Sequence, residues 1–221
     1  MKNIMALPDI KSNDPTRERI LDQAERLFAT RGFEAVSIRE ITGAAESNLA
    51  AVNYHFGTKK NLYLAVFRER WVERTRRIRA DFSRKLADNP QPTVPEVVKA
   101  MAGVFLEGPL NDEERRYHVQ LMQRELSHPG KALEMVVAEV VRPYQNQLAD
   151  LIRPNLPPAI EEERLRLCLL SILGMTIYFT FARPAVSMVI GREYSSEFKA
   201  RLIEHITEFA VKGLGALKEE K

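Results

Sequence analysis

Residues 37–62 read SIREITGAAESNLAAVNYHFGTKKNL, and this stretch contains the pattern of two short helices joined by a turn. Apolar residues recur in it at the three- and four-residue spacing of helices, and each run follows a residue that favours a helix N-cap. The first helix would begin at Ser37, and the second would run from Asn48 to about His55. Their inner faces would carry Ile38, Ile41 and Ala45 in the first, and Leu49, Val52 and Phe56 in the second.

Helices of two to three turns are marginal alone and need a platform to pack on. A longer helix precedes them, because Asp14 is a good N-cap, Pro15 suits a first helical position, and Gly32 ends the apolar pattern that follows. Thr58 would cap a fourth helix that extends to about Leu86. We therefore predict a small helix-turn-helix domain over residues 14–60, preceded by a flexible tail over residues 1–13 that shows no periodicity.

The prediction of DNA binding comes from the surface of the second short helix. In a helix-turn-helix, the second helix of the pair lies in the major groove and its outward residues contact base edges. Small side chains let the backbone approach the groove, Asn can pair with adenine through two hydrogen bonds, and Ala can contact a thymine methyl. The predicted outward residues fit this chemistry: Asn48, Ala50, Ala51 and Asn53.

At these positions the chain resembles the TetR family of transcriptional regulators. The residues that match the family pattern are Arg39, Ile41, Ala45, Phe56, Lys59 and Leu62, with Ser37 and Thr58 as conservative replacements and with Leu27–Phe28 and Gly32–Phe33 before them. The motif covers about a fifth of the chain, and its combined spacing is specific. Residues 48–57 resemble one branch of the family, whose C-terminal part is called the CerR type, and residues 125–151 resemble it more loosely.

The resemblance implies a division of labour among the contacts to DNA. Phosphates would be bound by Ser37, Tyr54, His55, Thr58 and Lys59, because helix N-termini and cations suit anionic oxygens. Bases would be read by Asn48, Leu49, Ala50, Ala51 and Asn53, and Arg39 could do either. Taken singly, His55 is as well explained by a local hydrogen bond, and Lys59–Lys60 by a solvated helix start.

The chain departs from the family pattern at three places. Glu46 stands where the turn usually has glycine, so a residue with a side chain would have to adopt a positive φ at a cost of about 1 kcal/mol. Ala50 replaces a second common glycine. Residues 53–55 read NYH where many members have an aromatic-rich run. These departures put the turn and the base contacts in question, but not the family.

The rest of the chain predicts an all-α protein of about nine helices. Beyond a proline-containing connector at residues 89–95, the apolar spacing favours helices at Glu96–Leu106, Asp112–Ser127, Pro129–Ile152, Glu161–Phe181 and Ser196–Leu217. Pro143 falls inside one of them and should kink it. Residues 61–221 are therefore assigned to a larger helical domain.

For this larger domain the resemblance implies a homodimer and a small-molecule effector. The last two long helices of each subunit would pair with their twins, through Leu169, Leu173, Ile177, Ile203, Ile206, Phe209 and Leu214. Some of these apolar positions would instead belong to the intrachain core. The candidate effector pocket would be lined by Met101, Phe105, Tyr117, His118, Met122, Arg124, Met135, Tyr144, Met175, Tyr178 and Phe179. Such a methionine-rich lining suits a medium-sized, partly apolar compound.

Together these features predict a repressor that binds a palindromic operator as a dimer and is released by its effector. The net charge of +3 permits an anionic partner without requiring one. The single cysteine, Cys168, excludes an internal disulfide, and no cofactor or metal is predicted.

The two alternatives are a DNA-binding protein that senses no ligand and, more remotely, an enzyme, for which the usual catalytic and nucleotide-binding motifs are missing. The most apolar stretch, Leu165–Ala182, is interrupted by polar residues, so we expect a cytoplasmic protein rather than a membrane protein.

Overall fold

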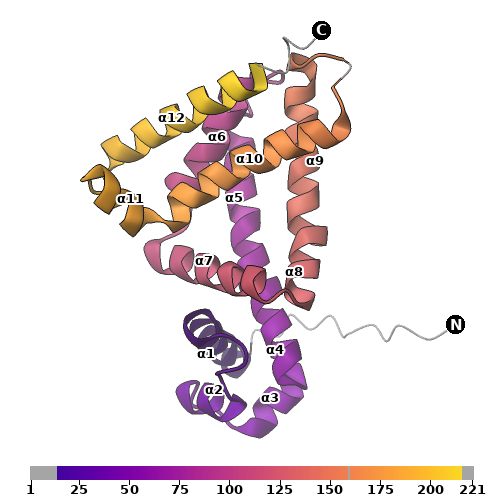
Figure 1. Ribbon diagram of the computed structural model, residues 1–221. Helices are drawn as coiled ribbons and strands as arrows, with labels where there is room; N and C mark the ends of the chain where they lie inside the picture. The colour runs from indigo at the N-terminus through magenta and orange to yellow at the C-terminus, as the bar shows by residue number, and fades with distance from the viewer. Residues whose placement is uncertain (1–13, 159, 216–221) are drawn as a thin grey trace, which may run out of the picture. The chain divides into compact units, whose positions relative to one another are not determined.

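The computed structural model describes residues 14–158 and 160–215, and the elements within these ranges are helices, which confirms the all-α prediction. The chain divides into an N-terminal unit that ends at Arg70 and a C-terminal unit that begins at Trp71. Figure 1 shows the helices of both units. The predicted tail at residues 1–13 lies outside the described residues.

The N-terminal unit consists of four helices around one small core. They are α1 (Pro15–Arg31), α2 (Ile38–Ala44), α3 (Leu49–Phe56) and α4 (Lys59–Val66). Phe28 on α1 and Tyr63 on α4 pack edge to face, with ring centroids 5.1 Å apart, and Phe33 lies 5.1 Å from the same tyrosine. Because α1 and α4 share this aromatic contact, they form the platform that the two short helices between them require.

Side-chain caps explain where the helices begin. Asp14 accepts a hydrogen bond from the backbone N–H of Thr16 at 2.8 Å, and Pro15 occupies the first helical position. At α2 the Ser37 hydroxyl accepts from the Glu40 N–H, while the Glu40 carboxylate accepts from the Ser37 N–H at 2.7 Å. This reciprocal arrangement is a capping box, and it lets a seven-residue helix begin at a fixed place.

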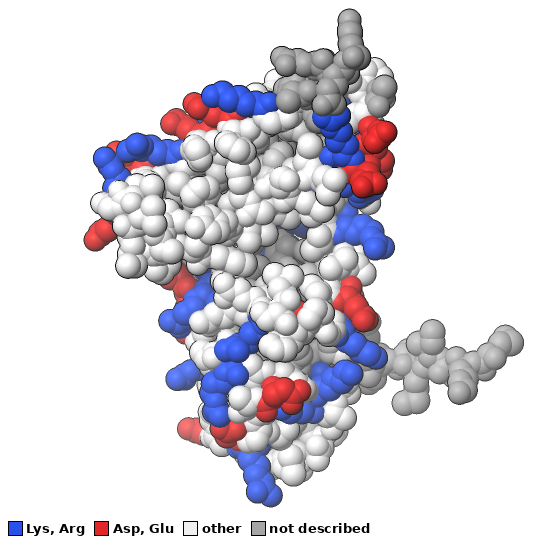
Figure 2. Space-filling model, in the orientation of Figure 1, with Lys and Arg blue, Asp and Glu red and all other residues white. Residues whose placement is uncertain are grey.

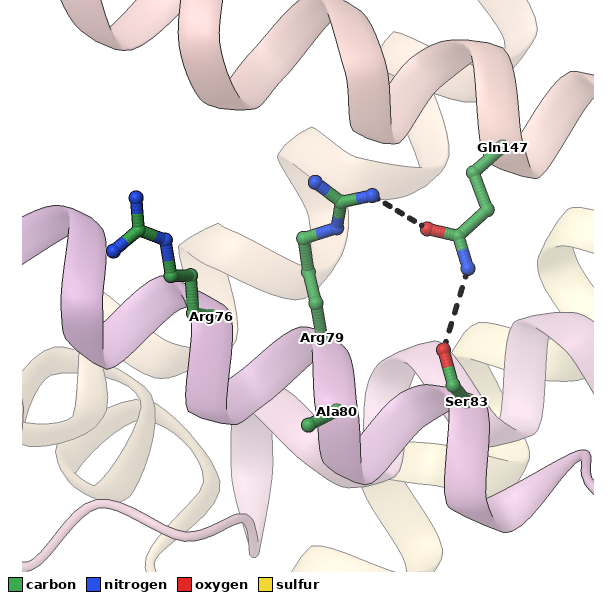
Figure 3. A pocket seen from close by; sticks show the side chains of 5 residues that line it. All are labelled: Arg76, Arg79, Ala80, Ser83 and Gln147. Carbon is green, nitrogen blue, oxygen red and sulfur yellow. Dashed lines mark hydrogen bonds between the residues drawn. The ribbon is translucent and has the colours of Figure 1, made fainter.

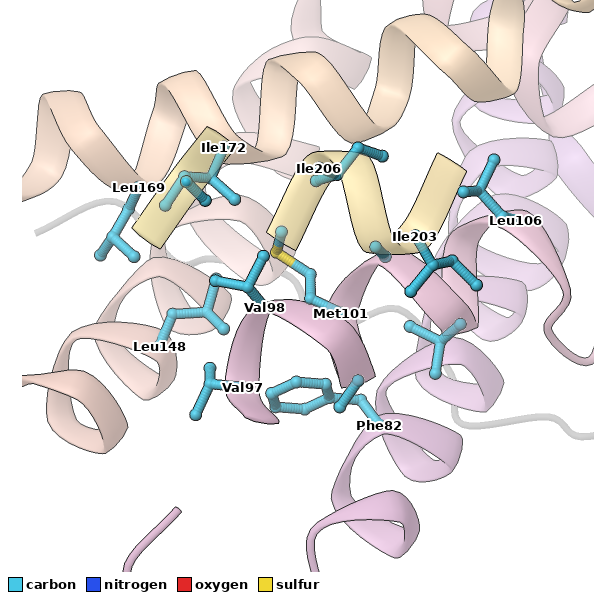
Figure 4. Packing of buried hydrophobic residues seen from close by; sticks show 14 of the residues in the cluster. Phe82, Val97, Val98, Met101, Leu106, Leu148, Leu169, Ile172, Ile203 and Ile206 are labelled. Atoms are coloured by element: carbon cyan, nitrogen blue, oxygen red, sulfur yellow. The ribbon is translucent and has the colours of Figure 1, made fainter. Parts of the chain in front are cut away.

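The C-terminal unit is built around α6, whose second half is almost entirely apolar and buried. Its elements are α5 (Val72–Lys85), α6 (Val94–Leu106), α7 (Asp112–Ser127), α8 (Lys131–Val136), α9 (Arg142–Ile152), α10 (Glu162–Phe181), α11 (Arg183–Ile190) and α12 (Ser196–Gly215). Eight of the thirteen residues of α6 are buried, and α5, α9, α10 and α12 surround it. A helix with so much of its apolar surface buried lies at the centre of its unit, and Glu96 and Lys99 of its first half reach the solvent. Figure 4 shows Val97, Val98 and Met101 of α6 packed among side chains of its neighbours.

Two long helical runs contain a wider π-helical turn. The first is η1 (Phe67–Trp71), between α4 and α5, and the second is η2 (Val137–Val141), between α8 and α9. The second turn lies immediately before Pro143, which has no N–H to donate and whose ring would clash with a carbonyl one turn earlier. The π turn accommodates the proline, because the wider turn removes the need for the missing N–H.

The structure differs from the predicted helix map in two places. A short helix that the sequence did not predict, α11, follows α10 with Pro184 in its first turn. The boundary between the two units also falls at residue 70 rather than at residue 60. The reason is that Leu62, Tyr63 and Val66 of α4 are buried in the N-terminal core.

Helix α10 combines a buried side with an exposed apolar side. By length and composition it could cross a membrane, and 28% of its most apolar window is buried inside the chain. Leu165, Leu169 and Ile172 pack in the core, whereas Leu167, Leu170 and Tyr178 are exposed. The exposed side therefore has no cover within the described residues.

The capping box at α2 predicts a pH-dependent contribution to stability. Hydrogen bonds from Ser37, and then the charge and hydrogen bond of Arg31, lower the pKa of Glu40 from 4.5 to about 2. A carboxylate with a lowered pKa stabilises the fold above its unfolded value of 4.5, and this contribution is lost as the pH falls towards 2. Glu40→Gln should lower the free energy of unfolding at pH 7, measured by urea denaturation, and the deficit should shrink as the pH falls below 4.5.

Glu34→Gln is the matched control, because Glu34 is an exposed carboxylate in the preceding loop. It should leave stability nearly unchanged at every pH. A deficit for Glu40→Gln that stays constant with pH would contradict the role given to its charge.

Candidate nucleic-acid interface

Helix α3 is held by one side only. Val52 and Phe56, which are 1% and 8% exposed, fix its inner face in the N-terminal core. Its start is fixed by Asn48, whose side-chain oxygen accepts from the Ala51 N–H at 2.9 Å, and its end by Gly57 at φ 73°. An eight-residue helix could not hold this position without such anchors.

The opposite face of α3 is open to solvent. Tyr54 is 83% exposed and Leu49 is 52% exposed, although large side chains usually avoid water, and Ala50 and Asn53 are exposed beside them. Ala51 is half-buried. The face thus carries neutral hydrogen-bonding, methyl and aromatic groups without a charged side chain, which is the chemistry that reads base edges in a major groove.

The turn between α2 and α3 sets the position of α3. Glu46 adopts φ 48°, so the residue that replaces the expected glycine has a left-handed backbone conformation. The Ser47 N–H donates to the Thr42 carbonyl at 2.9 Å, and the Glu46 N–H donates to the Gly43 carbonyl at 3.3 Å. These two bonds form a Schellman motif, which requires a positive φ at its penultimate residue. The turn is therefore formed at the cost of strain at Glu46.

Polar and cationic groups flank α3 on both sides. Ser37 and Arg39 are exposed at the first turn of α2, and Thr58 is exposed as the N-cap of α4, where its hydroxyl accepts from the Asn61 N–H. Lys59 is half-buried, and its ammonium lies 4.3 Å from the centre of the Phe33 ring. The neighbouring Lys60 is exposed and was not selected from the sequence. It offers an ammonium at the same helix N-terminus that is not held over a ring.

One predicted phosphate contact is largely turned away from solvent. His55 was expected to bind phosphate, but its side chain is only 9% exposed and its Nε2 lies 3.2 Å from Oδ2 of Asp14. Asp14 is the N-cap of α1, so His55 ties the end of α3 to the start of α1. The structure thus gives His55 a contact within the N-terminal unit, which was the alternative role considered for it in the sequence.

Arg17 of α1 and Arg70 of η1 brace the N-terminal unit through ion pairs that no sequence pattern predicted. Arg17 donates to both carboxylate oxygens of Glu69, at 2.7 and 2.5 Å, and its guanidinium lies 5.1 Å from the centre of the Phe56 ring. Arg70 in turn donates to Glu18 at 2.7 Å and to Asp22 at 2.9 Å. Because these partners are about fifty residues apart in the chain, no local pattern could have indicated them.

Comparisons with known proteins agree with this geometry. Residues 20–66 match the model of the tetR family of bacterial regulatory proteins, and residues 96–214 match the C-terminal domain of the HTH-type transcriptional dual regulator CecR. The chain belongs to the TetR family. It carries a CecR-type C-terminal domain, which is the branch expected above under the name CerR. Members of this family are DNA-binding transcription regulators and not enzymes, as predicted.

Similar proteins span most of this TetR-family chain. It is 24% identical to CecR of Shigella flexneri over 86% of each chain, and 23% identical to the repressor NicS of Pseudomonas putida over 91% of this chain and 93% of that protein. The repressor AcnR of Corynebacterium glutamicum is 41% identical, but only over 24% of this chain and 29% of AcnR.

Solved structures share the fold. The fatty acid degradation regulator FadR from Bacillus halodurans matches with a TM-score of 0.63 at 19% identity, over 92% of this chain and 98% of that one. A tetR-family regulatory protein from Rhodococcus matches with a TM-score of 0.65 at 18% identity, over 91% and 98%.

The predicted dimer residues are mostly core residues. Leu169, Ile203, Ile206 and Leu214 are buried in their own unit and have no surface to offer a partner. Leu173 and Ile177 are half-buried, and Phe209 is exposed. Because α10 and α12 carry apolar residues on both sides, the predicted residues that keep surface for a partner are Leu173, Ile177 and Phe209.

The residues predicted to line an effector pocket differ in burial. Met101 and Tyr144 belong to the main core, Tyr117 is buried, and Tyr178 is exposed on α10 rather than turned inward. His118 stacks on Trp71 with ring centroids 4.3 Å apart, and burial, aided by Arg74 and Arg77, lowers the pKa of His118 to about 3. The others are half-buried: Phe105, Met122, Arg124, Met135, Met175 and Phe179.

The positive φ of Glu46 predicts that glycine at this position makes the folded protein more stable. Removing the side chain relieves about 1–2 kcal/mol of left-handed strain, against about 0.5–1 kcal/mol of extra chain entropy in the unfolded state. Glu46→Gly should therefore raise the free energy of unfolding by about 0.5–1 kcal/mol, measured by urea denaturation. Glu46→Ala keeps the strained Cβ and should give no gain, whereas a loss of stability in Glu46→Gly would refute the strain.

Proposed function

We propose that the protein is a repressor that binds a palindromic operator as a homodimer and is released by a small-molecule effector. The observation that carries the DNA-binding part is the geometry of α3, which is anchored by Val52 and Phe56 and exposes an uncharged face opposite them. A helix held in this way can enter a major groove without losing its own support.

The contacts to DNA divide between bases and phosphates. Asn53, Ala50 and Leu49 on the exposed face of α3 are assigned to bases, with Asn48 and the half-buried Ala51 at its start. Ser37, Arg39, Tyr54, Thr58 and Lys59 are assigned to the phosphates on either side, and Lys60 joins them on the basis of its exposure. His55 is removed from this set.

The homodimer is supported by the exposed side of α10 and α12. In Figure 2 a broad surface over these helices carries no charged side chain, and Lys, Arg, Asp and Glu lie around its edge. Its exposed apolar residues are Leu167, Leu170 and Tyr178 on α10 and Phe209 on α12. In a TetR-family regulator such a face fits a second copy of the chain better than lipid, because regulators of operators with two half-sites about 34–36 Å apart need two reading helices.

Release by an effector is supported by buried polar groups in the C-terminal unit. The hydroxyl of Tyr144 and both amide atoms of Gln145 are buried and have no hydrogen-bond partner among the described residues. Such groups are costly unless something else satisfies them. A ligand bound near them would favour a conformation in which the two reading helices no longer fit successive grooves. Such a regulator acts in the cytoplasm, where the DNA is.

The assignment of contacts predicts two different defects. Lys60→Ala should weaken binding to every duplex similarly and reduce the salt slope of the association constant by about 1, because one phosphate contact is lost. Asn53→Ala should instead relax the preference at particular base pairs, at a cost of about 1–3 kcal/mol for the preferred base. Both are measured by fluorescence anisotropy with duplexes selected from random DNA.

Arg84→Ala is the control for charge, because Arg84 is an exposed arginine of the C-terminal unit that pairs with Asp81. It should bind like the wild type. Wild-type behaviour of both Lys60→Ala and Asn53→Ala would exclude α3 and its flank as the DNA surface.

The dimer surface predicts a second, independent defect. Leu170→Glu places a charge at the centre of the exposed apolar face of α10 and should give a folded monomer with weak operator binding, measured by analytical ultracentrifugation and by anisotropy. Leu126→Glu alters an equally exposed leucine on α7 and should remain a dimer. A dimeric Leu170→Glu protein would place the interface elsewhere.

A further inference from the structure

A groove lies between α5 and α9 in the C-terminal unit, with a volume of about 350 Å³. This volume is within the range of sites for small ligands. Arg76, Arg79, Ala80 and Ser83 line it from α5, and Gln147 lines it from α9 (Figure 3). None of the residues predicted from the sequence to form the effector pocket is among them.

Ion pairs neutralise three other arginines of α5, but not Arg79. Arg76 pairs with Glu73 at 2.8 Å, Arg84 pairs with Asp81 at 2.7 Å, and Arg77 pairs with Glu114. Arg79 is different, because its Nη2 donates to the neutral side-chain oxygen of Gln147 at 3.0 Å. No carboxylate of the described residues lies within ion-pair distance of this half-buried guanidinium.

The partner that Arg79 does have is easily replaced. Gln147 accepts from Arg79 and donates to the Ser83 hydroxyl at 3.5 Å, the limit of a hydrogen bond, as the dashed lines in Figure 3 show. Hydrogen bonds between a guanidinium and a carboxylate or phosphate are roughly twice as strong as bonds between neutral groups. An anion in the groove would therefore displace Gln147 from Arg79, and the freed amide and Ser83 could donate to it as well.

A buried hydroxyl, that of Tyr144, lies one helical turn from Gln147 and outside the residues that line the groove. The Tyr144 ring packs edge to face on Phe82 of α5, with centroids 5.7 Å apart, and its hydroxyl is buried with no partner among the described residues. Burial raises the pKa of Tyr144, so the hydroxyl keeps its proton and can donate a hydrogen bond to an acceptor. Arg79 is close enough for its charge to act on this hydroxyl.

We propose that the groove between α5 and α9 binds an organic anion, whose carboxylate or phosphate group pairs with Arg79 in place of Gln147. Arg76 at the open side and Ser83 complete the recognition of the head group. The inference rests on the proposed function in one respect, since it takes this anion to be the effector. It names the effector as acidic, where the sequence pointed only to a partly apolar compound.

The test is isothermal titration of the full chain with matched pairs of acids and neutral analogues. Benzoate is compared with benzamide, octanoate with octanamide, and phenyl phosphate with phenol, so that the carboxylate and phosphate arms are read separately. The wild type should bind at least one acid and should bind its neutral analogue more weakly. Arg79→Gln should weaken binding of that acid by about 10- to 100-fold, because a charge-assisted pair is lost.

Two variants control for loss of charge and loss of fold. Arg84→Gln removes a positive charge from the same helix outside the groove and should bind the acid like the wild type. Arg79→Lys keeps the charge without the planar fork and should bind between the wild type and Arg79→Gln. Should Arg79→Gln fail to fold, a wild-type affinity in Arg79→Lys for both acid and neutral analogue would still overturn the site.

The inference is overturned if no acid of the panel binds at millimolar concentration, if neutral analogues bind as well as the acids, or if Arg79→Gln and the wild type bind alike. Operator binding without any ligand is measured on the same proteins and separates this failure from failure of the proposed function. Arg79→Gln should bind the operator like the wild type. Normal operator binding without anion binding refutes only the inference, whereas anion binding without DNA binding refutes the proposed function.

Discussion

The burial of Val52 and Phe56 is the contact on which the rest of the functional surface depends. These two side chains fix which side of α3 faces inward, so they also fix that Ala50, Asn53 and Tyr54 face outward. The helix is too short to persist in isolation, and the platform of α1 and α4 exists to hold it. The Arg17 guanidinium over the Phe56 ring and the contact between His55 and Asp14 hold the C-terminal end of α3 in place. The two side chains that α3 contributes to the small core therefore determine which of its residues are exposed to solvent.

Much of this unit could be predicted from residues that act locally. Ser37, Asn48 and Thr58 cap their helices as their side chains dictate, and the strain at Glu46 follows from the turn alone. His55 and Lys59 could not be assigned in the same way. His55 is turned inward by an aspartate 41 residues earlier, and Lys59 is drawn over Phe33, and neither contact leaves a trace in the spacing of the sequence.

In the C-terminal unit, the spacing of apolar residues was not enough to identify the buried side of each helix. Where a helix is apolar on one side, the pattern identifies its buried face, but α10 carries leucines at positions 165, 167, 169 and 170 and offers two apolar sides. The central position of α6 decides which side is the core, and that position depends on all its neighbours at once. The pairing of Arg79 with Gln147, 68 residues apart, is equally a property of the assembled fold. Sequence therefore predicted the helices and their number approximately, but not the faces by which they meet ligands or each other.

The most direct test is to locate the surface of the protein that binds DNA. Hydrogen–deuterium exchange of the full chain, with and without a duplex selected from random DNA, reads this directly. When DNA is bound, exchange should slow in residues 37–61, which cover α2, α3 and the start of α4, and should not change in α7 and α8. Unchanged exchange in α3 on saturating DNA, or protection confined to the C-terminal unit, would contradict it.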